Sequence, residues 1–263
     1  MDLKKVLDEV SGFIKLHGDR VYEHWDEVTV AEEKDAVDIS TNFDVEIEKL
    51  FAEFVSVHFP EHGFKGEELS ELNREGEYVW HIDPIDGTKY FIKGVPLWGL
   101  TLALVKGDEP VLGVIYNPVA KQLYTAYQGG GAFMNEKKLE INPETDPAKV
   151  QLVWDLTTWK YEWEKYKDKL TGASAQLMST FYRVRALGNG AYSLAWLAQG
   201  LFGAYADPYR HKDKFVDIAA GVLIAKEAGA AVYRNPLGND LEQLIIAKSE
   251  LIDVIRPIIE LKA

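Results

Sequence analysis

The sequence predicts an α+β fold in which helices are layered on sheets. Apolar side chains recur at helical spacing over residues 3–25 and 41–58. Short apolar segments separated by turn residues fill most of residues 78–134, as expected for an antiparallel meander. Beyond residue 150, strand-like and helix-like segments alternate. These observations together favour helices packed on sheets over an all-helical or all-strand fold.

Two long helices are predicted at the N-terminal end, and an acid-rich loop over residues 32–35 separates them. The second helix begins at Thr41, where Asp44 three residues later is typical of a capped helix start. Pro60 and Gly63 end this helix, because neither residue favours its continuation.

The remaining elements follow from the same patterns, and they suggest two halves that share a core. Strands are predicted over residues 78–82, 97–105, 111–116, 122–127, 131–134, 150–156, 183–187, 231–233 and 244–247. Helices are predicted over residues 161–170, 192–199, 217–228 and 251–261. We assign residues 1–150 to an N-terminal half and residues 151–263 to a C-terminal half.

Composition excludes several classes of protein. The 263 residues are 47% apolar and 27% charged, as in an ordinary globular protein, and no apolar run is long enough to span a membrane. We therefore expect a cytoplasmic location and no membrane partner. The net charge of −13 argues against nucleic acid as the main partner, because such binding needs a basic surface. The absence of cysteine leaves oxygen or histidine ligands for any metal.

The densest chemical signal is the string from Asp83 to Thr88, which reads Asp-Pro-Ile-Asp-Gly-Thr at the end of a predicted strand. Two aspartates three residues apart across a turn can aim both carboxylates at one point, as hard divalent cations require. Gly87 and Thr88 open the next segment, whose free N–H groups can hold a phosphate. Metal ligands and a phosphate site would therefore be adjacent, although Asp-Pro and Asp-Gly pairs are also common in plain turns.

Three further acidic segments have simpler explanations when each is taken alone. Glu67 lies in a charged loop, Asp44 lies at a helix start, and Asp217 could be the N-cap of the helix that follows it. Their order and spacing around the string beginning at Asp83 are not explained in this way.

Together these segments resemble the inositol monophosphatase superfamily. The resemblance rests on the string at 83–88, Gly66-Glu67-Glu68 before it, and Asp217-Ile218-Ala219-Ala220-Gly221 with Glu227-Ala228-Gly229 after it. It implies a layered α/β/α/β/α sandwich of the inositol monophosphatase and fructose-1,6-bisphosphatase type, usually assembled as a homodimer. It also implies hydrolysis of a phosphate monoester of a small phosphorylated metabolite by water activated with two or three Mg²⁺ ions.

The resemblance also assigns roles by position. The implied metal ligands are Glu67, Asp83, the Ile85 carbonyl, Asp86 and Asp217, with Asp83 bridging two ions. The implied catalytic residues are Glu67 and the pair Asp44 and Thr88, which helps to orient the attacking water. The implied substrate-binding residues are Gly87, Thr88, Gly188, Asn189 and Arg210.

The substrate is left open by the sequence. Arg210 stands where inositol monophosphatases carry an acidic residue that contacts substrate hydroxyls, so it could favour a second anionic group or simply belong to a solvated basic loop. Lys89 and Phe91 look more like members that act on histidinol phosphate or phosphoadenosine phosphates. Inositol 1-phosphate is the default, and fructose 1,6-bisphosphate, histidinol phosphate and 3′-phosphoadenosine 5′-phosphate are alternatives.

Two other classes of function compete with the enzyme. A metal- and phosphate-binding regulator would keep the site but show little turnover. A purely structural domain would show no dependence of its stability on metal. Retention of Glu67, Asp83, Asp86 and Asp217 favours the enzyme.

Overall fold

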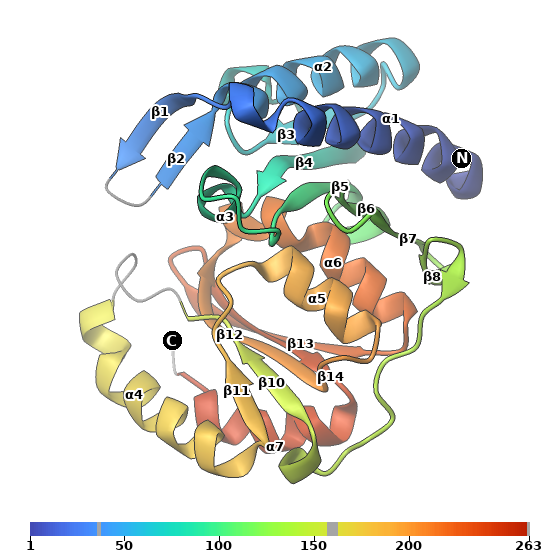
Figure 1. Ribbon diagram of the computed structural model, residues 1–263. Helices are drawn as coiled ribbons and strands as arrows, with labels where there is room; N and C mark the ends of the chain where they lie inside the picture. The colour runs from blue at the N-terminus through green and yellow to red at the C-terminus, as the bar shows by residue number, and fades with distance from the viewer. Residues whose placement is uncertain (36–37, 157–162, 262–263) are drawn as a thin grey trace.

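The computed structural model describes residues 1–35, 38–156 and 163–261, and these form the predicted layered sandwich (Figure 1). Helices α1 (Leu3–Glu23) and α2 (Asn42–His58) cover the outer face of the first sheet. Helices α5 (Gly190–Ala198) and α6 (Phe215–Glu227) lie between the two sheets. Below the second sheet lie α4 (Trp163–Thr180) and α7 (Ser249–Ile259). The α/β/α/β/α order is therefore confirmed.

The first sheet has seven strands in the order β3-β4-β5-β6-β7-β8-β9. Their bounds are β3 (Gly63–Gly66), β4 (Tyr78–Asp86), β5 (Gly99–Lys106), β6 (Glu109–Asn117), β7 (Gln122–Tyr127), β8 (Gly131–Met134) and β9 (Lys137–Lys138). Neighbours from β4 onward pair antiparallel, so the predicted meander is confirmed. Only β3, which sequence analysis missed, pairs parallel with β4 at the edge.

Strand β4 runs farther than predicted and carries the acidic string on its end. The sequence placed a stop before Asp83, whereas β4 continues through Pro84 to Asp86. Its pairing with β5 is irregular between Asp83 and Asp86, so Pro84 sits where the regular ladder is already interrupted. Such irregularities re-aim side chains, which is why they recur beside functional sites.

The second sheet has five strands in the order β11-β10-β12-β14-β13. Their bounds are β10 (Gln151–Trp154), β11 (Arg183–Arg185), β12 (Ala204–His211), β13 (Ala231–Gly238) and β14 (Leu241–Ala247). The central strand β12 was not predicted, because Asp207, Pro208 and Arg210 interrupt its apolar pattern. Pairing between β12 and β14 is irregular between Asp207 and Arg210, where the ladder accommodates Pro208.

The N-terminal elements correct one prediction and confirm another. The acid-rich loop predicted at 32–35 is instead part of strand β1 (Val30–Asp35), which pairs with β2 (Asp38–Thr41) in a separate two-stranded sheet. The capped start of α2 is confirmed, because Thr41 and Asp44 form a reciprocal capping box. The predicted start of the helix at 161–170 falls partly outside the described residues, and α4 continues to Thr180.

The two halves of the chain share one apolar core. A boundary near residue 150 separates the strands of the two sheets. However, α5 and α6 from the second half pack on the first sheet, and one buried cluster includes Ala103, Ile115, Leu223 and Ile246. Across the described residues, none of the helices has the length and apolar character needed to cross a bilayer.

Candidate active site

The end of β4 places two buried aspartates at the edge of the first sheet. Asp83 is 3% exposed and Asp86 is 8% exposed. The backbone N–H of Ile85 donates to Asp83 Oδ1 at 3.1 Å, which fixes the turn between the two carboxylates. The N–H of Ala191 in the first turn of α5 donates to Asp86, whose Oδ2 is buried and accepts no hydrogen bond from any residue that the structure describes. A buried acceptor oxygen with no partner is unusual in a native protein and fits a site for a cation.

Glu67 approaches these aspartates from the loop that follows β3. The side chain of Glu48, on α2, holds this loop in place and is fully buried. Its carboxylate accepts the N–H of Glu68 at 2.8 Å and the N–H of Leu69 at 2.7 Å. A Cβ on Gly66 would lie 1.9 Å from Glu48 Oε1, so only glycine fits at this point. Glu48 was missed by sequence reasoning, although a glutamate one turn after Asp44 on the apolar face of α2 is the signal that marks it.

Asp217 approaches from the opposite side, in the first turn of α6. The helix begins at Phe215 and its N-cap is Lys214, so the interpretation of Asp217 as an N-cap is wrong. Its position in the first turn favours a negative charge, because the N-terminal end of a helix carries a partial positive charge.

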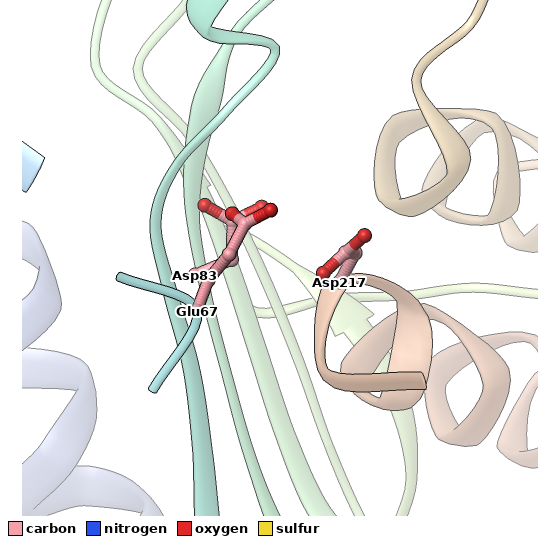
Figure 2. A group of neighbouring side chains, drawn as sticks. All are labelled: Glu67, Asp83 and Asp217. Atoms are coloured by element: carbon pink, nitrogen blue, oxygen red, sulfur yellow. The ribbon is translucent and has the colours of Figure 1, made fainter. Parts of the chain in front are cut away.

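The structure brings Glu67, Asp83 and Asp217 together. Figure 2 shows Glu67 and Asp83 side by side, with Asp217 facing them from the tip of α6. One carboxylate oxygen from each lies within 4.8 Å of the others. Asp86 is outside this group of three. Its charge nevertheless raises the pKa of Asp83, and the charges of Asp217 and Glu67 raise the pKa of Asp86.

Mutual repulsion in this group shows in the pKa of each buried aspartate. Burial raises the pKa of Asp83 well above its ordinary value, and the charges of Glu67, Asp86, Asp217 and Asp44 raise it further. Burial raises the pKa of Asp86 as well, followed by the charges of Asp217 and Glu67. Carboxylates packed in this way need positive charge between them to be ionised together. The all-oxygen donor set suits Mg²⁺ or another hard divalent cation.

Asp44 is a buried candidate residue in the first turn of α2. It is 1% exposed, and its Oδ2 accepts hydrogen bonds from the N–H of Thr41 at 2.7 Å and the hydroxyl of Thr41 at 2.6 Å. Within the described ranges of the chain, its buried Oδ1 accepts no hydrogen bond. Burial, opposed by these hydrogen bonds, raises the pKa of Asp44 to about 8. In the described part of the chain no hydrogen bond joins Asp44 to Thr88, whose hydroxyl donates instead to the Ile85 carbonyl at 2.9 Å.

The fold and this cluster agree with comparison to known proteins. The model of the inositol monophosphatase family matches residues 2–252. The chain belongs to this family.

Two relatives and one solved structure illustrate the range of the family. A fructose-1,6-bisphosphatase/inositol-1-monophosphatase of Aquifex aeolicus is 31% identical over 87% of this chain and 85% of its own length. The Nus factor SuhB of Xylella fastidiosa is 32% identical over 76% of this chain and 70% of its own. The IMPase structure from Thermotoga maritima is 25% identical, covers 97% of this chain and 96% of its own, and superposes with a TM-score of 0.82.

Two turns that are predicted to bind substrate, at Gly87 and at Gly188-Asn189, meet beside Asp86 in this member of the family. Gly87 has a φ of 90°, and a Cβ there would lie 2.6 Å from the Leu97 carbonyl oxygen, so glycine is required. Asn189, which follows Gly188, caps α5 by accepting the Tyr192 N–H at 2.9 Å. The Asn189 Nδ2 lies 3.5 Å from the Asp86 carbonyl oxygen, so this side chain joins the two turns. Their contacts with a substrate stay a prediction.

Arg210 does not belong to a solvated loop, so that interpretation is wrong. It lies on β12, is 6% exposed and stands opposite Glu242 of β14. Its Nε is 3.9 Å from Glu242 Oε1, and its guanidinium lies over the ring of Phe215 at 5.6 Å. Burial raises the pKa values of Asp155 and Asp207, and the charge of Arg210 opposes this rise in both. The positive charge therefore sits among carboxylates, and a contact between Arg210 and a substrate anion stays a prediction.

Phe91 lies in the core, and the substrate preference suggested by Lys89 and Phe91 stays a prediction. It is fully buried and packs edge-on against Trp98 with a 4.6 Å separation of ring centres. Lys89, two residues earlier in α3 (Thr88–Ile92), is exposed. The phenylalanine is thus a core residue of the N-terminal half.

Proposed function

We propose that this chain is a Mg²⁺-dependent phosphoric monoester hydrolase that acts on a small phosphorylated metabolite, with inositol 1-phosphate as the default substrate. The observation that carries the proposal is the approach of Glu67, Asp83 and Asp217 within 4.8 Å, in a chain of this family. A solved neighbour described as an IMPase/NADP phosphatase complexed with Mg²⁺ and phosphate supports the choice of metal.

The residues proposed to hold two or three Mg²⁺ ions are Glu67, Asp83, the Ile85 carbonyl, Asp86 and Asp217. When bound, the ions supply Lewis-acid stabilisation of phosphoryl oxygens and lower the pKa of water. Hydrogen bonds within the fold position two of these ligands, because the Ile85 N–H donates to Asp83 and the Glu68 and Leu69 amides donate to Glu48, which holds the Glu67 loop.

Asp44 and Glu67 are proposed to orient the attacking water and to accept its proton. Asp44 Oδ1 is an acceptor that no described residue uses, and its carboxyl has an elevated pKa, so it can accept a hydrogen bond from water and hold a proton. The Thr88 hydroxyl is oriented by the Ile85 carbonyl, which directs the hydroxyl oxygen as an acceptor. The N–H groups of Gly87 and Thr88 are proposed to bind the phosphate.

Phosphate release from a panel of substrates tests this proposal. The panel contains inositol 1-phosphate, fructose 1,6-bisphosphate, histidinol phosphate and 3′-phosphoadenosine 5′-phosphate, each with Mg²⁺ and with EDTA. We expect release only with Mg²⁺ and a strong preference for one compound. The preference would also report on Arg210, because a second anionic group on the favoured substrate would support its proposed contact.

The variant Asp83→Asn tests the site assignment. Loss of this carboxylate from the residues that would hold metal should lower kcat/KM by about three orders of magnitude or more while leaving the circular dichroism spectrum unchanged. Asp108→Asn, in the exposed turn between β5 and β6, changes the net charge equally and should be near normal. Near-normal hydrolysis by Asp83→Asn would remove Asp83 from the mechanism.

A second candidate function is a regulatory protein that binds metal and phosphate with little turnover. The relative named Nus factor SuhB favours this possibility. Metal binding without release from any compound of the panel would support the regulator over the enzyme.

A further inference from the structure

A lysine side chain lies among the carboxylates that are proposed to bind metal. The Nζ of Lys214 is 2.5 Å from Glu67 Oε1 and 3.9 Å from Asp217 Oδ2. Lys214 ends the short helix η4 (Lys212–Lys214) and caps α6, so it precedes Asp217 by one turn. Its ammonium therefore joins the two sides of the site shown in Figure 2, from the Glu67 loop to the tip of α6.

The position of Lys214 is fixed by the fold, but its side chain is able to leave. Residues three apart on a helix face are neighbours, so the i,i+3 relation to Asp217 holds the base of the side chain beside the site. The side chain is 41% exposed, whereas that of Glu67 is 17% exposed. A lysine carries a point charge on a flexible stem, so it can swing into solvent without disturbing the backbone.

An ammonium and a divalent cation held at the same carboxylate oxygen compete for its negative charge. Positive charges a few ångströms apart repel each other, and both are attracted to the same negative group. Lys214 Nζ donates to Glu67 Oε1, so a metal ion that binds this oxygen would be repelled by the ammonium unless the lysine side chain moved away.

We propose that Lys214 is a tethered cation that competes with divalent metal for Glu67 and Asp217. It relieves repulsion among the carboxylates when metal is absent, and it weakens metal binding when metal is present. This inference rests on the proposed function only in taking Glu67, Asp83 and Asp217 as metal ligands.

Isothermal titration with Mg²⁺ tests the proposal on three full-length chains: the wild type, Lys214→Met and Lys212→Met. Methionine keeps the length of the side chain and removes its charge. Lys212 is exposed in the same turn and its side chain makes no ion pair with a described residue, so Lys212→Met is a control for the change in net charge. We expect Lys214→Met to bind Mg²⁺ about three- to tenfold more tightly than Lys212→Met, as for loss of one partly exposed ion pair.

Thermal unfolding provides a readout that does not depend on activity. In EDTA, Lys214→Met should melt a few degrees below Lys212→Met, because the carboxylates lose their internal counter-charge. With saturating Mg²⁺ this difference should disappear. Equal or weaker Mg²⁺ binding by Lys214→Met would overturn the proposal and leave the hydrolase assignment standing. Absence of Mg²⁺ binding in all three chains would overturn both the role of Lys214 and the hydrolase assignment. Tighter Mg²⁺ binding by Lys214→Met without hydrolysis by the wild type would support the role of Lys214 and contradict only the hydrolase activity.

Discussion

A single buried glutamate holds the loop that carries Glu67. Glu48 accepts two backbone hydrogen bonds, from Glu68 and Leu69, and occupies the space that a side chain on Gly66 would need. Burial raises its pKa to about 7, although both hydrogen bonds oppose the rise. The ionised carboxylate has acceptor positions for both amides, whereas a neutral amide presents donors to one of them.

The variant Glu48→Gln should therefore weaken metal binding without removing a metal ligand. We expect half-saturating Mg²⁺ to rise roughly tenfold, as for loss of a group that orients a metal ligand. Glu53→Gln, on the exposed side of the same helix, is the matched control. Titration of Mg²⁺ against both variants decides the question, and equal affinities would show that the loop does not depend on Glu48.

Arg210 is expected to stabilise the fold, because its buried positive charge offsets the charges of neighbouring carboxylates. Its guanidinium is buried against Glu242 and Phe215, and Asp155 and Asp207 respond to its charge. Removal of one partner from a buried ionic cluster leaves the remaining charges without compensation. Arg210→Met should lower the free energy of unfolding by about 3–5 kcal/mol in urea denaturation. The double variant Arg210→Met/Glu242→Leu should recover part of this loss, and a loss of less than about 1 kcal/mol in the single variant would contradict the argument.

Among single residues, the contiguous string from Asp83 to Thr88 could be identified from local spacing, whereas the distant Glu67 and Asp217 were named only through the family resemblance. The residues that support Glu67 from other segments were missed. Glu48 reaches the amides of Glu68 and Leu69, and Lys214 reaches Glu67, only after distant segments have packed together. No local pattern encodes such a contact, although the placement of Glu48 on an apolar helix face was a usable signal.

Ends of four elements supply the carboxylates of the site. Asp44 lies in the first turn of α2, Glu67 follows β3, Asp83 lies near the end of β4 and Asp217 lies in the first turn of α6. Each end is fixed by its own packing, so the repulsion among the carboxylates is not relieved by movement. The repulsion is instead relieved by protons or by cations.

This arrangement predicts how pH changes the stabilisation by metal. Burial raises the pKa of Asp44 to about 8 and that of Glu48 to about 7, and it also raises the pKa values of Asp83 and Asp86. The folded metal-free chain therefore binds more protons than the unfolded chain between about pH 4 and 8, so its stability falls as pH rises through this range. Each excess proton corresponds to about 1.4 kcal/mol per pH unit.

Mg²⁺ replaces these protons, so the gain in melting temperature on adding Mg²⁺ should grow from about pH 5 to pH 8. Thermal unfolding with Mg²⁺ and with EDTA at each pH provides the measurement. In Asp83→Asn the growth should be much smaller. A gain that stays constant with pH in the wild type would show that the carboxylates are ionised without metal.

Elements with a regular apolar period were predicted well, and irregular ones were not. The meander from β4 to β8 and the helices α2 and α6 follow from periodicity alone. Strand β3 is short and contains glycine at both ends, and β12 contains Pro208. Both are held in place by neighbouring strands rather than by their own residues, so a local pattern could not identify them.

On the scale of the whole molecule, the middle helical layer joins the two sheets into one core. Gly113 of β6 is so close to α6 that a Cβ there would lie 2.9 Å from the Ala220 carbonyl oxygen. Leu223 of α6 belongs to a buried cluster with Ile115 of the first sheet and Ile246 of the second. The division at residue 150 therefore separates the two sheets but cuts through packing that they share.

Native-state hydrogen exchange distinguishes one cooperative unit from two. If the middle layer couples the sheets, the slowest amides of β5 and β14 should exchange through the same global unfolding, with free energies within about 1 kcal/mol of each other. Leu223→Ala removes buried volume from the shared layer and should lower both free energies together, by about 2–5 kcal/mol. Leu16→Ala, whose side chain is mostly exposed on α1, should change neither. A fall confined to one sheet would mean that the halves unfold separately, because a shared core cannot lose packing on one side alone.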